Sequence, residues 1–176
     1  SPLTKKTITM AKATMVQTAP HPIFRYRWSI FTVLALAYFF VYFHRLSLSV
    51  VADRLMAEFG SSAGTIGMLG SIYFYCYAAM QLPAGLLSDS VGPRRTVTWF
   101  LLAASVGSIV FGLASTIATA FAGRIMVGFG VSMVFIPTMK ILSQWYYPSE
   151  FASMAGMLNA VGGIAVLAGT WLLAVM

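Results

Sequence analysis

The stretch Gly85-Leu-Leu-Ser-Asp89-Ser-Val-Gly92-Pro-Arg94-Arg95 decides the fold of this chain. It joins two long uncharged segments, Phe59–Ser88 and Thr96–Gly123. Gly92 followed by a proline is a turn signal, so the stretch predicts a tight hairpin between two helices. Asp89 stands at the end of the first helix, where a negative charge is unfavourable against that helix's own dipole. We therefore expect Asp89 to have another partner, either an arginine or the N-terminus of a different helix.

The composition on either side of this hairpin requires an apolar environment. Of the 176 residues, 59% are apolar and only 9% are charged, whereas a soluble domain carries about 25% charged residues. A domain of this size cannot bury so much apolar surface, and disorder needs low hydrophobicity, so both classes are excluded. The chain is predicted to lie in a lipid bilayer. Its single cysteine, Cys76, excludes a disulfide framework and a cysteine-rich metal site.

The uncharged segments predict an all-α polytopic membrane protein. A helix needs about 20 apolar residues to cross the hydrocarbon, and segments this long are helices rather than strands of a barrel. Five spans are predicted: 28–51, 65–87, 96–115, 119–145 and 152–175. Residues 1–27 are predicted to be a flexible cytoplasmic tail without the features of a secretory signal, and residues 28–176 to be the helix bundle.

The basic residues predict the orientation of these spans. Seven of them fall on one side, against Arg54 alone on the other, and the side richer in lysine and arginine is normally cytoplasmic. The seven are Lys5, Lys6, Lys12, Arg25, Arg27, Arg94 and Arg95. We expect a cytoplasmic N-terminus in a bacterial inner membrane, and a basic tail that contacts anionic lipid rather than nucleic acid. Five spans then place the C-terminus outside without a polar flank, which suggests part of a longer protein, although a naturally short chain stays open.

Three motifs carry a resemblance to one family. The pattern Gly85-x-x-x-Asp89-x-x-Gly92-x-Arg94-Arg95 resembles the signature loop between the second and third helices of the major facilitator superfamily, with Ser90 in place of the usual basic residue. The pattern Arg124-x-x-x-Gly128-x-Gly130 resembles the family's fourth-helix motif. The segment from Trp145 to Gly156 resembles the loop between helices four and five, with Phe151 where an arginine is common.

The resemblance implies a fold and a way of working. Members of the family have two six-helix halves with substrate bound between them near the midplane. This chain would supply helices one to five of the first half, and its partner would be the missing C-terminal half of the same transporter. The loop of Gly85, Asp89, Gly92, Arg94 and Arg95 would act as a conformational switch.

The charges inside the first span suggest a binding site. A charged side chain in hydrocarbon costs at least about 2.5–3.5 kcal/mol, so Arg45 needs a reason to be there. Two interpretations stay open: Arg45 extends to the outer interface, or it binds an anion in a cavity, as a late first-helix arginine does in relatives that carry organic anions. His44 lies about 100° around the helix, so only one of the two is expected to face the cavity. His44 is kept as a candidate for solute binding or proton coupling.

Further candidates lie in the fourth and fifth spans. As the motif arginine, Arg124 is expected to bond a carbonyl of the first helix, to join a proton relay or to extend toward the interface. Lys140 is a candidate at the cavity floor, three residues after Pro137, which predicts a kink.

Asn159 is a candidate polar residue of the cavity. It stands beside a stripe of small residues that permits close helix packing, either within this half or against the missing one; the stripe is Ala152, Gly156, Ala160 and Gly163.

Two functional classes compete on this sequence. The first is a secondary transporter of a small solute that works by alternating access, and Arg45 favours an organic anion as this solute. No nucleotide-binding loop occurs, so an ion gradient or exchange would supply the energy and no cofactor is expected. The second is a membrane sensor or assembly subunit on a transporter scaffold. An enzyme is not expected, because two histidines and four acidic residues form no catalytic group.

Overall fold

The computed structural model describes residues 24–175, and these residues form helices without any strand. They divide into two units, of which the first ends at Thr32 and the second begins at Val33. The first unit contributes only the start of helix α2 (Phe24–Phe59). The predicted flexible tail therefore has two parts: residues 1–23 lie outside the described residues, and residues 24–27 are the first turn of α2.

Seven helices occupy the described residues, and the first of them, α2, extends beyond the predicted span 28–51 at both ends. After α2 come α3 (Ala63–Ala79), α4 (Gln81–Ser90), α5 (Pro93–Gly112), α6 (Ile117–Ser132), α7 (Phe135–Trp145) and α8 (Pro148–Val175). Within residues 24–175, four stretches are long and apolar enough to cross a membrane: 26–46, 93–112, 117–145 and 148–171. The second predicted span is divided between α3, with 17 residues, and α4, with 10. The fold is that of an all-α polytopic membrane protein.

Two prolines explain why two of the predicted spans are interrupted. Pro137 lacks an amide hydrogen and cannot bond the carbonyl of Met133, and helix α6 gives way to α7 at Met133 and Val134. The predicted kink in the fourth span is confirmed. Pro83 has the same effect on the carbonyl of Ala79, and α3 gives way to α4 at Met80.

Glycines bring the backbones of α5 and α6 into contact. A Cβ atom at Gly123 would lie 2.5 Å from the amide nitrogen of Phe111, and one at Gly130 would lie 2.5 Å from the amide nitrogen of Ala104. A Cβ at Gly128 would lie 2.9 Å from the carbonyl oxygen of Tyr73 on α3. Helix α6 is therefore packed against α5 and α3 at distances that no larger side chain permits. Its buried face joins Ala37 and Val41 of α2 in the hydrophobic core.

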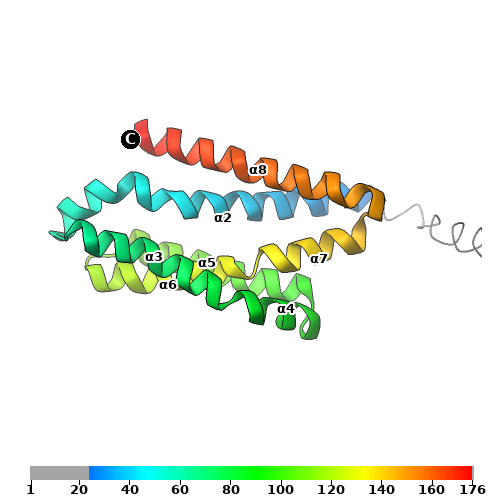
Figure 1. Ribbon diagram of the computed structural model, residues 1–176, viewed down its shortest axis with the longest axis horizontal. Helices are drawn as coiled ribbons and strands as arrows, with labels where there is room; N and C mark the ends of the chain where they lie inside the picture. Colours follow the sequence, from blue (N-terminus) through cyan, green and yellow to red (C-terminus); the bar gives the residue numbers. More distant parts are fainter. Residues whose placement is uncertain (1–23, 176) are drawn as a thin grey trace, which may run out of the picture. The chain divides into compact units, whose positions relative to one another are not determined.

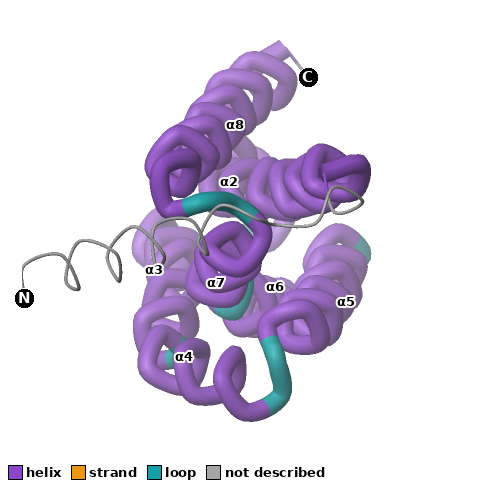
Figure 2. The backbone as a smooth tube through the Cα atoms, turned by 90° about the vertical axis from the view of Figure 1, so that its right-hand side faces the viewer, coloured by secondary structure: helices purple, strands orange, loops and turns teal. Residues whose placement is uncertain are grey.

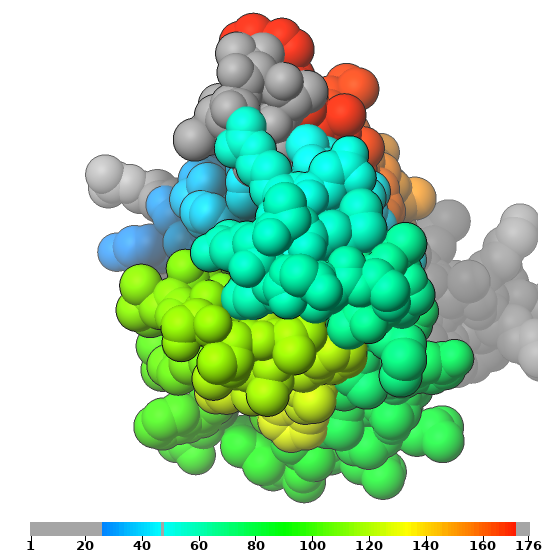
Figure 3. All heavy atoms as spheres, turned by 90° about the vertical axis from the view of Figure 1, so that its left-hand side faces the viewer, coloured from blue at the N-terminus to red at the C-terminus, as the bar shows by residue number. Residues whose placement is uncertain are grey.

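The turns of the second unit gather at two ends, which are opposite in Figure 1. One end carries the α2–α3 and α5–α6 turns and is called here the α2–α3 end (Figure 3). The other carries the α4–α5 and α7–α8 turns, which both face the viewer in Figure 2, and is called the α4–α5 end. Gly92 makes the α4–α5 turn with a φ of 93°, which side chains other than glycine rarely adopt.

Candidate solute-binding site

Arg45 lies on α2 near the α2–α3 end, beside a pocket of 410 Å³. Its guanidinium carbon is 5.1 Å from the ring centre of Phe74 on α3 and 6.0 Å from that of Tyr42. The side chain is exposed to this open space rather than packed. The pocket is lined mainly by α2 and α3, and Arg124 from α6 also lines it. None of the residues that line it is acidic.

Arg124 is the largest fully buried side chain of the described residues, with 2% of its surface exposed. Its Nη1 donates a hydrogen bond of 3.0 Å to the backbone oxygen of His44. The predicted bond to a first-helix carbonyl is therefore confirmed. The guanidinium lies 5.0 Å from the ring centre of Tyr73 and 5.7 Å from that of Phe111. Its Nε has no acceptor within the part of the chain that the structure describes.

His44 faces a different pocket from Arg45. Its Nε2 lies 3.0 Å from the hydroxyl oxygen of Ser108 on α5, and both residues line a second pocket of 390 Å³ between α2, α5 and α6. The Ser108 hydroxyl also lies 2.9 Å from the carbonyl of Ala104. The Ser108 hydroxyl therefore contacts both His44 and the α5 backbone. The adjacent residues His44 and Arg45 thus point in different directions, because each residue of a helix is rotated by about 100° from the one before it.

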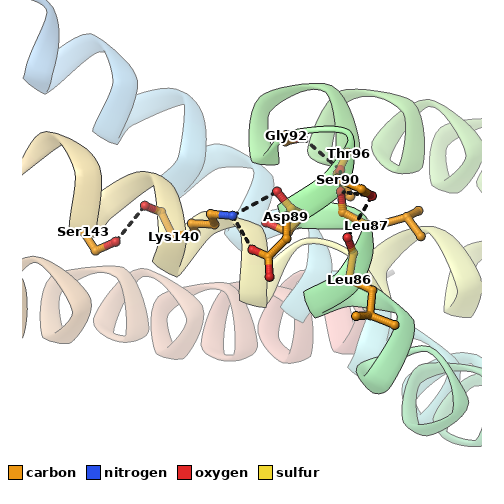
Figure 4. Close-up of polar contacts among 9 residues, drawn as sticks. Leu86, Leu87, Asp89, Ser90, Gly92, Thr96, Lys140 and Ser143 are labelled. Atoms are coloured by element: carbon orange, nitrogen blue, oxygen red, sulfur yellow. Dashed lines mark hydrogen bonds and ion pairs between the residues drawn. The ribbon is translucent and has the colours of Figure 1, made fainter.

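Lys140 binds Asp89 at the α4–α5 end (Figure 4). Its Nζ forms an ion pair with Oδ1 of Asp89 and donates a hydrogen bond of 3.1 Å to the carbonyl of Ser88. The sequence suggested an arginine or a helix N-terminus as the partner of Asp89, and the structure instead provides a lysine from α7. Lys140 lines neither of the two pockets described above.

A second contact also joins the α4–α5 turn to α7. The guanidinium of Arg94 lies 4.9 Å from the ring centre of Trp145, the last residue of α7. Arg95 is exposed at the start of α5, and a Cβ at Gly85 would meet nothing within 4 Å. Of the predicted switch loop, Asp89 and Arg94 thus contact α7.

Asn159 connects α8 to α2. The hydroxyl of Tyr38 donates a hydrogen bond of 3.2 Å to Oδ1 of Asn159, and Nδ2 of Asn159 donates to the carbonyl of Ala155. The small-residue stripe beside it is exposed, and a Cβ at Gly156 or Gly163 would meet nothing within 4 Å. Within the described residues, this stripe has no packing partner.

The structure assembles groups that the sequence left apart. Arg45 and Arg124 share a pocket, whereas His44, Lys140 and Asn159 each lie against a different neighbour. Sequence reasoning missed Ser108 as the polar neighbour of His44, and Phe74 and Tyr73 as the aromatic neighbours of Arg45 and Arg124. A serine and two aromatic residues in apolar spans are too common to be selected by spacing alone.

These features define the chain as part of a polytopic α-helical membrane protein with a cationic pocket. Residues 34–176 match the sequence profile of the Major Facilitator Superfamily. The chain belongs to this family, as its three motifs suggested.

Several proteins named as transporters are similar to this chain. The probable sulfoacetate transporter SauU of Cupriavidus necator is 27% identical over 134 residues, which cover 76% of this chain and 31% of that protein. The probable hexose phosphate transport protein of Chlamydia trachomatis is 30% identical over 149 residues, covering 82% and 33%. The probable galactarate/D-glucarate transporter GudP of Pseudomonas putida is 27% identical over 142 residues, covering 77% and 31%. The chain spans about a third of the length of these relatives.

Proposed function

We propose that this chain is the N-terminal part of a secondary transporter that moves a small organic anion across a bacterial plasma membrane by alternating access. The observation that supports the proposal is the position of Arg45. It is a permanent cation inside a membrane-spanning helix, exposed to a pocket of 410 Å³ that contains no acidic side chain. The names of the relatives, which include sulfoacetate, hexose phosphate and galactarate transporters, agree with an anionic solute.

Arg45 suits this role by its geometry. A guanidinium is planar and offers two parallel N–H donors, which match the two oxygens of a carboxylate or of a phosphate. The ring faces of Phe74 and Tyr42 stabilise the cation while the pocket is empty, since the negative face of an aromatic ring attracts a positive charge. The side chain therefore remains in the bundle without a carboxylate partner.

The transport cycle of this proposal needs a facing half. The exposed stripe of Ala152, Gly156, Ala160 and Gly163 is a surface on which another helix packs closely, and the second half of the transporter is its proposed partner. The energy source in this proposal is an ion gradient or exchange. Asp89 and Lys140, at the opposite end from Arg45, regulate the change between states rather than touch the solute.

Solute uptake tests the proposal. The full-length protein that contains this chain is reconstituted in lipid vesicles, and uptake of radiolabelled galactarate is measured with and without unlabelled competitor. We expect saturable uptake that is lost in Arg45→Ala, whereas the isolated 176 residues take up nothing. Absence of saturable uptake of galactarate, sulfoacetate and a hexose phosphate by the folded full-length protein would favour the alternative of a non-transporting sensor or assembly subunit.

Orientation is tested separately. The excess of basic residues supports a cytoplasmic position of the N-terminus and of the α4–α5 end. Single cysteines at Ser90 and Thr116, in a Cys76→Ser background, are treated in intact cells with a thiol reagent that does not cross the membrane. Labelling at 116 and not at 90 is expected, and the reverse pattern contradicts the proposed orientation.

A further inference from the structure

Arg124 is a buried cation without a carboxylate. Only 2% of its surface is exposed, and its contacts are one backbone carbonyl and the faces of two aromatic rings. An ion in a dry interior needs an opposite charge and acceptors for its remaining hydrogens, because its desolvation costs several kcal/mol. Within the described residues neither requirement is met, since Nε lacks an acceptor and no acidic side chain pairs with the guanidinium. A cation whose role is only to hold helices together is expected to have both an opposite charge and a full set of acceptors.

The pocket beside Arg124 is the place where these requirements are met by a ligand. Arg124 and Arg45 come from different helices, α6 and α2, and line the same 410 Å³ space. Phe74 and Tyr73, consecutive on α3, place one aromatic ring against each guanidinium. The lining otherwise consists of small and apolar residues together with Ser49. The pocket therefore carries two positive charges and no negative charge.

We infer that Arg124 is a second anion contact in this pocket, and that the pocket binds an organic anion with two negative groups, one on each arginine. The inference rests on the proposed function and extends it from an anion to a doubly charged anion. Two negative groups leave the loaded pocket neutral, whereas one group leaves an uncompensated guanidinium in the membrane interior. An anionic oxygen at Arg124 also supplies the acceptor that its Nε lacks.

A purely structural role for Arg124 makes a different prediction. Its bond to the carbonyl of His44 joins α6 to α2. If this were its only role, replacement would weaken the bundle and lower the affinity for every solute by the same factor. If Arg124 instead binds the second negative group, its replacement lowers the affinity only for the solute that has this group.

Two solutes that differ in one group test the inference. Galactarate and galactonate have the same hydroxylated six-carbon chain, but galactarate carries a carboxylate where galactonate carries a hydroxymethyl group. Calorimetry on the purified full-length protein in detergent measures the affinity for both. We expect galactarate to bind the unmodified protein about 10- to 100-fold more tightly, which corresponds to one charge-assisted bond.

The variants identify which arginine binds which negative group of the solute. Arg124→Gln is expected to remove the preference for galactarate and to change galactonate affinity less than about threefold, whereas Arg45→Gln weakens both solutes. Arg124→Lys keeps the charge without the planar fork and retains part of the preference, and it replaces the glutamine variant if that variant does not fold. Arg54→Gln is the matched control, because it removes an exposed cation from α2 that does not line the pocket, and it leaves both affinities unchanged.

The outcomes separate this inference from the proposed function. Equal loss of both solutes in Arg124→Gln, equal affinity of the unmodified protein for both, or binding of neither would overturn the inference. Uptake of galactonate as effective as that of galactarate would do the same while leaving a transporter in place. The expected binding pattern without any uptake would instead overturn transport and leave the two-arginine pocket standing.

Discussion

The cations of the two ends of the bundle are held in different ways. At the α4–α5 end, Lys140 is paired with Asp89 and with a carbonyl, and Arg94 lies over Trp145. At the α2–α3 end, Arg45 and Arg124 contact rings and one carbonyl but no carboxylate. Within the described residues, the buried Arg124 thus lacks an opposite charge, whereas the more exposed Lys140 has one. If stability alone decided the pairing, the more deeply buried cation would be the one with a carboxylate partner, because an unpaired charge costs more in an apolar interior.

The difference distinguishes two uses of positive charge. A cation that already has a carboxylate, such as Lys140, joins two helices. A cation that is left without one stays available to a solute. The ion pair therefore points to control of conformation at one end, and the unpaired arginines point to binding at the other. Each prediction below disturbs one side of this comparison.

The largest effect is expected from Gly123→Ala, which disturbs the α2–α3 end through its packing. The added Cβ would lie 2.5 Å from the Phe111 amide nitrogen, so α5 and α6 have to separate. Overpacking of this kind costs about 1–3 kcal/mol, and it displaces the adjacent Arg124. Thermal unfolding in detergent measures the loss. Gly156→Ala is the matched control, since its Cβ meets nothing within 4 Å; a similar loss there would show that the contact is not responsible.

Removal of the Arg45 side chain acts on the same end through binding alone. Arg45→Ala is expected to weaken anion binding about 10- to 100-fold, because a bidentate charge-assisted bond is lost. Arg45→Lys retains part of the affinity. The melting temperature changes little in both variants, since the side chain is exposed. Calorimetry and thermal unfolding on the same preparations check this, and normal binding by Arg45→Ala would mean that the arginine only extends to the membrane interface.

The Lys140–Asp89 pair is expected to affect rates more than affinities. The two side chains are 32% and 73% exposed, so their pairing stabilises the bundle by only about 0.2–1 kcal/mol. Asp89→Asn in the full-length protein slows uptake, while solute affinity stays within a few-fold of the original. The charge exchange Asp89→Lys with Lys140→Asp restores part of the rate. A large loss of equilibrium binding in Asp89→Asn would place this residue in the solute site, and the two ends of the bundle would then not differ in their roles.

The smallest effect is expected from the contact between Arg94 and Trp145. Their cation–π attraction is worth about 0.5–1 kcal/mol at an exposed position. A double-mutant cycle with Arg94→Gln and Trp145→Leu measures the coupling by thermal unfolding. Trp145→Phe keeps a ring face and retains part of it. A coupling near zero would leave Asp89 and Lys140 as the only link tested between the α4–α5 turn and α7.

The fold follows from local sequence signals, whereas the site does not. Runs without charge predict apolar helices, Pro137 predicts the break between α6 and α7, and Gly92 predicts the α4–α5 turn. These signals act within a few residues, so the sequence contains them directly. The distribution of Arg45 and His44 between two pockets follows in part from the 100° turn of a helix. Which of them meets Arg124 depends on how α2, α3 and α6 pack.

The ion pair shows the same limit. An acid at the end of α4 predicts that a partner exists, but Lys140 lies 51 residues further along the chain. Many cations in the sequence have the correct charge, and only the packing of α7 beside α4 selects one of them. The motifs indicate the family that residues 34–176 match, and the pocket on which binding depends is formed by side chains that the motifs leave unspecified.

The glycine contacts between α5 and α6 have a mechanical consequence. Two backbones that touch at Gly107, Gly123 and Gly130 cannot slide past each other without a collision of main-chain atoms. The two helices therefore form a fixed frame that carries Arg124 with it. Helix α3 is held to the same frame, because a Cβ at Gly128 would lie 2.9 Å from the carbonyl oxygen of Tyr73. Any change in the width of the pocket must therefore come from α2, which contains Arg45, moving against that frame. Arg124 therefore keeps its position in the frame, while Arg45 moves toward or away from it together with α2.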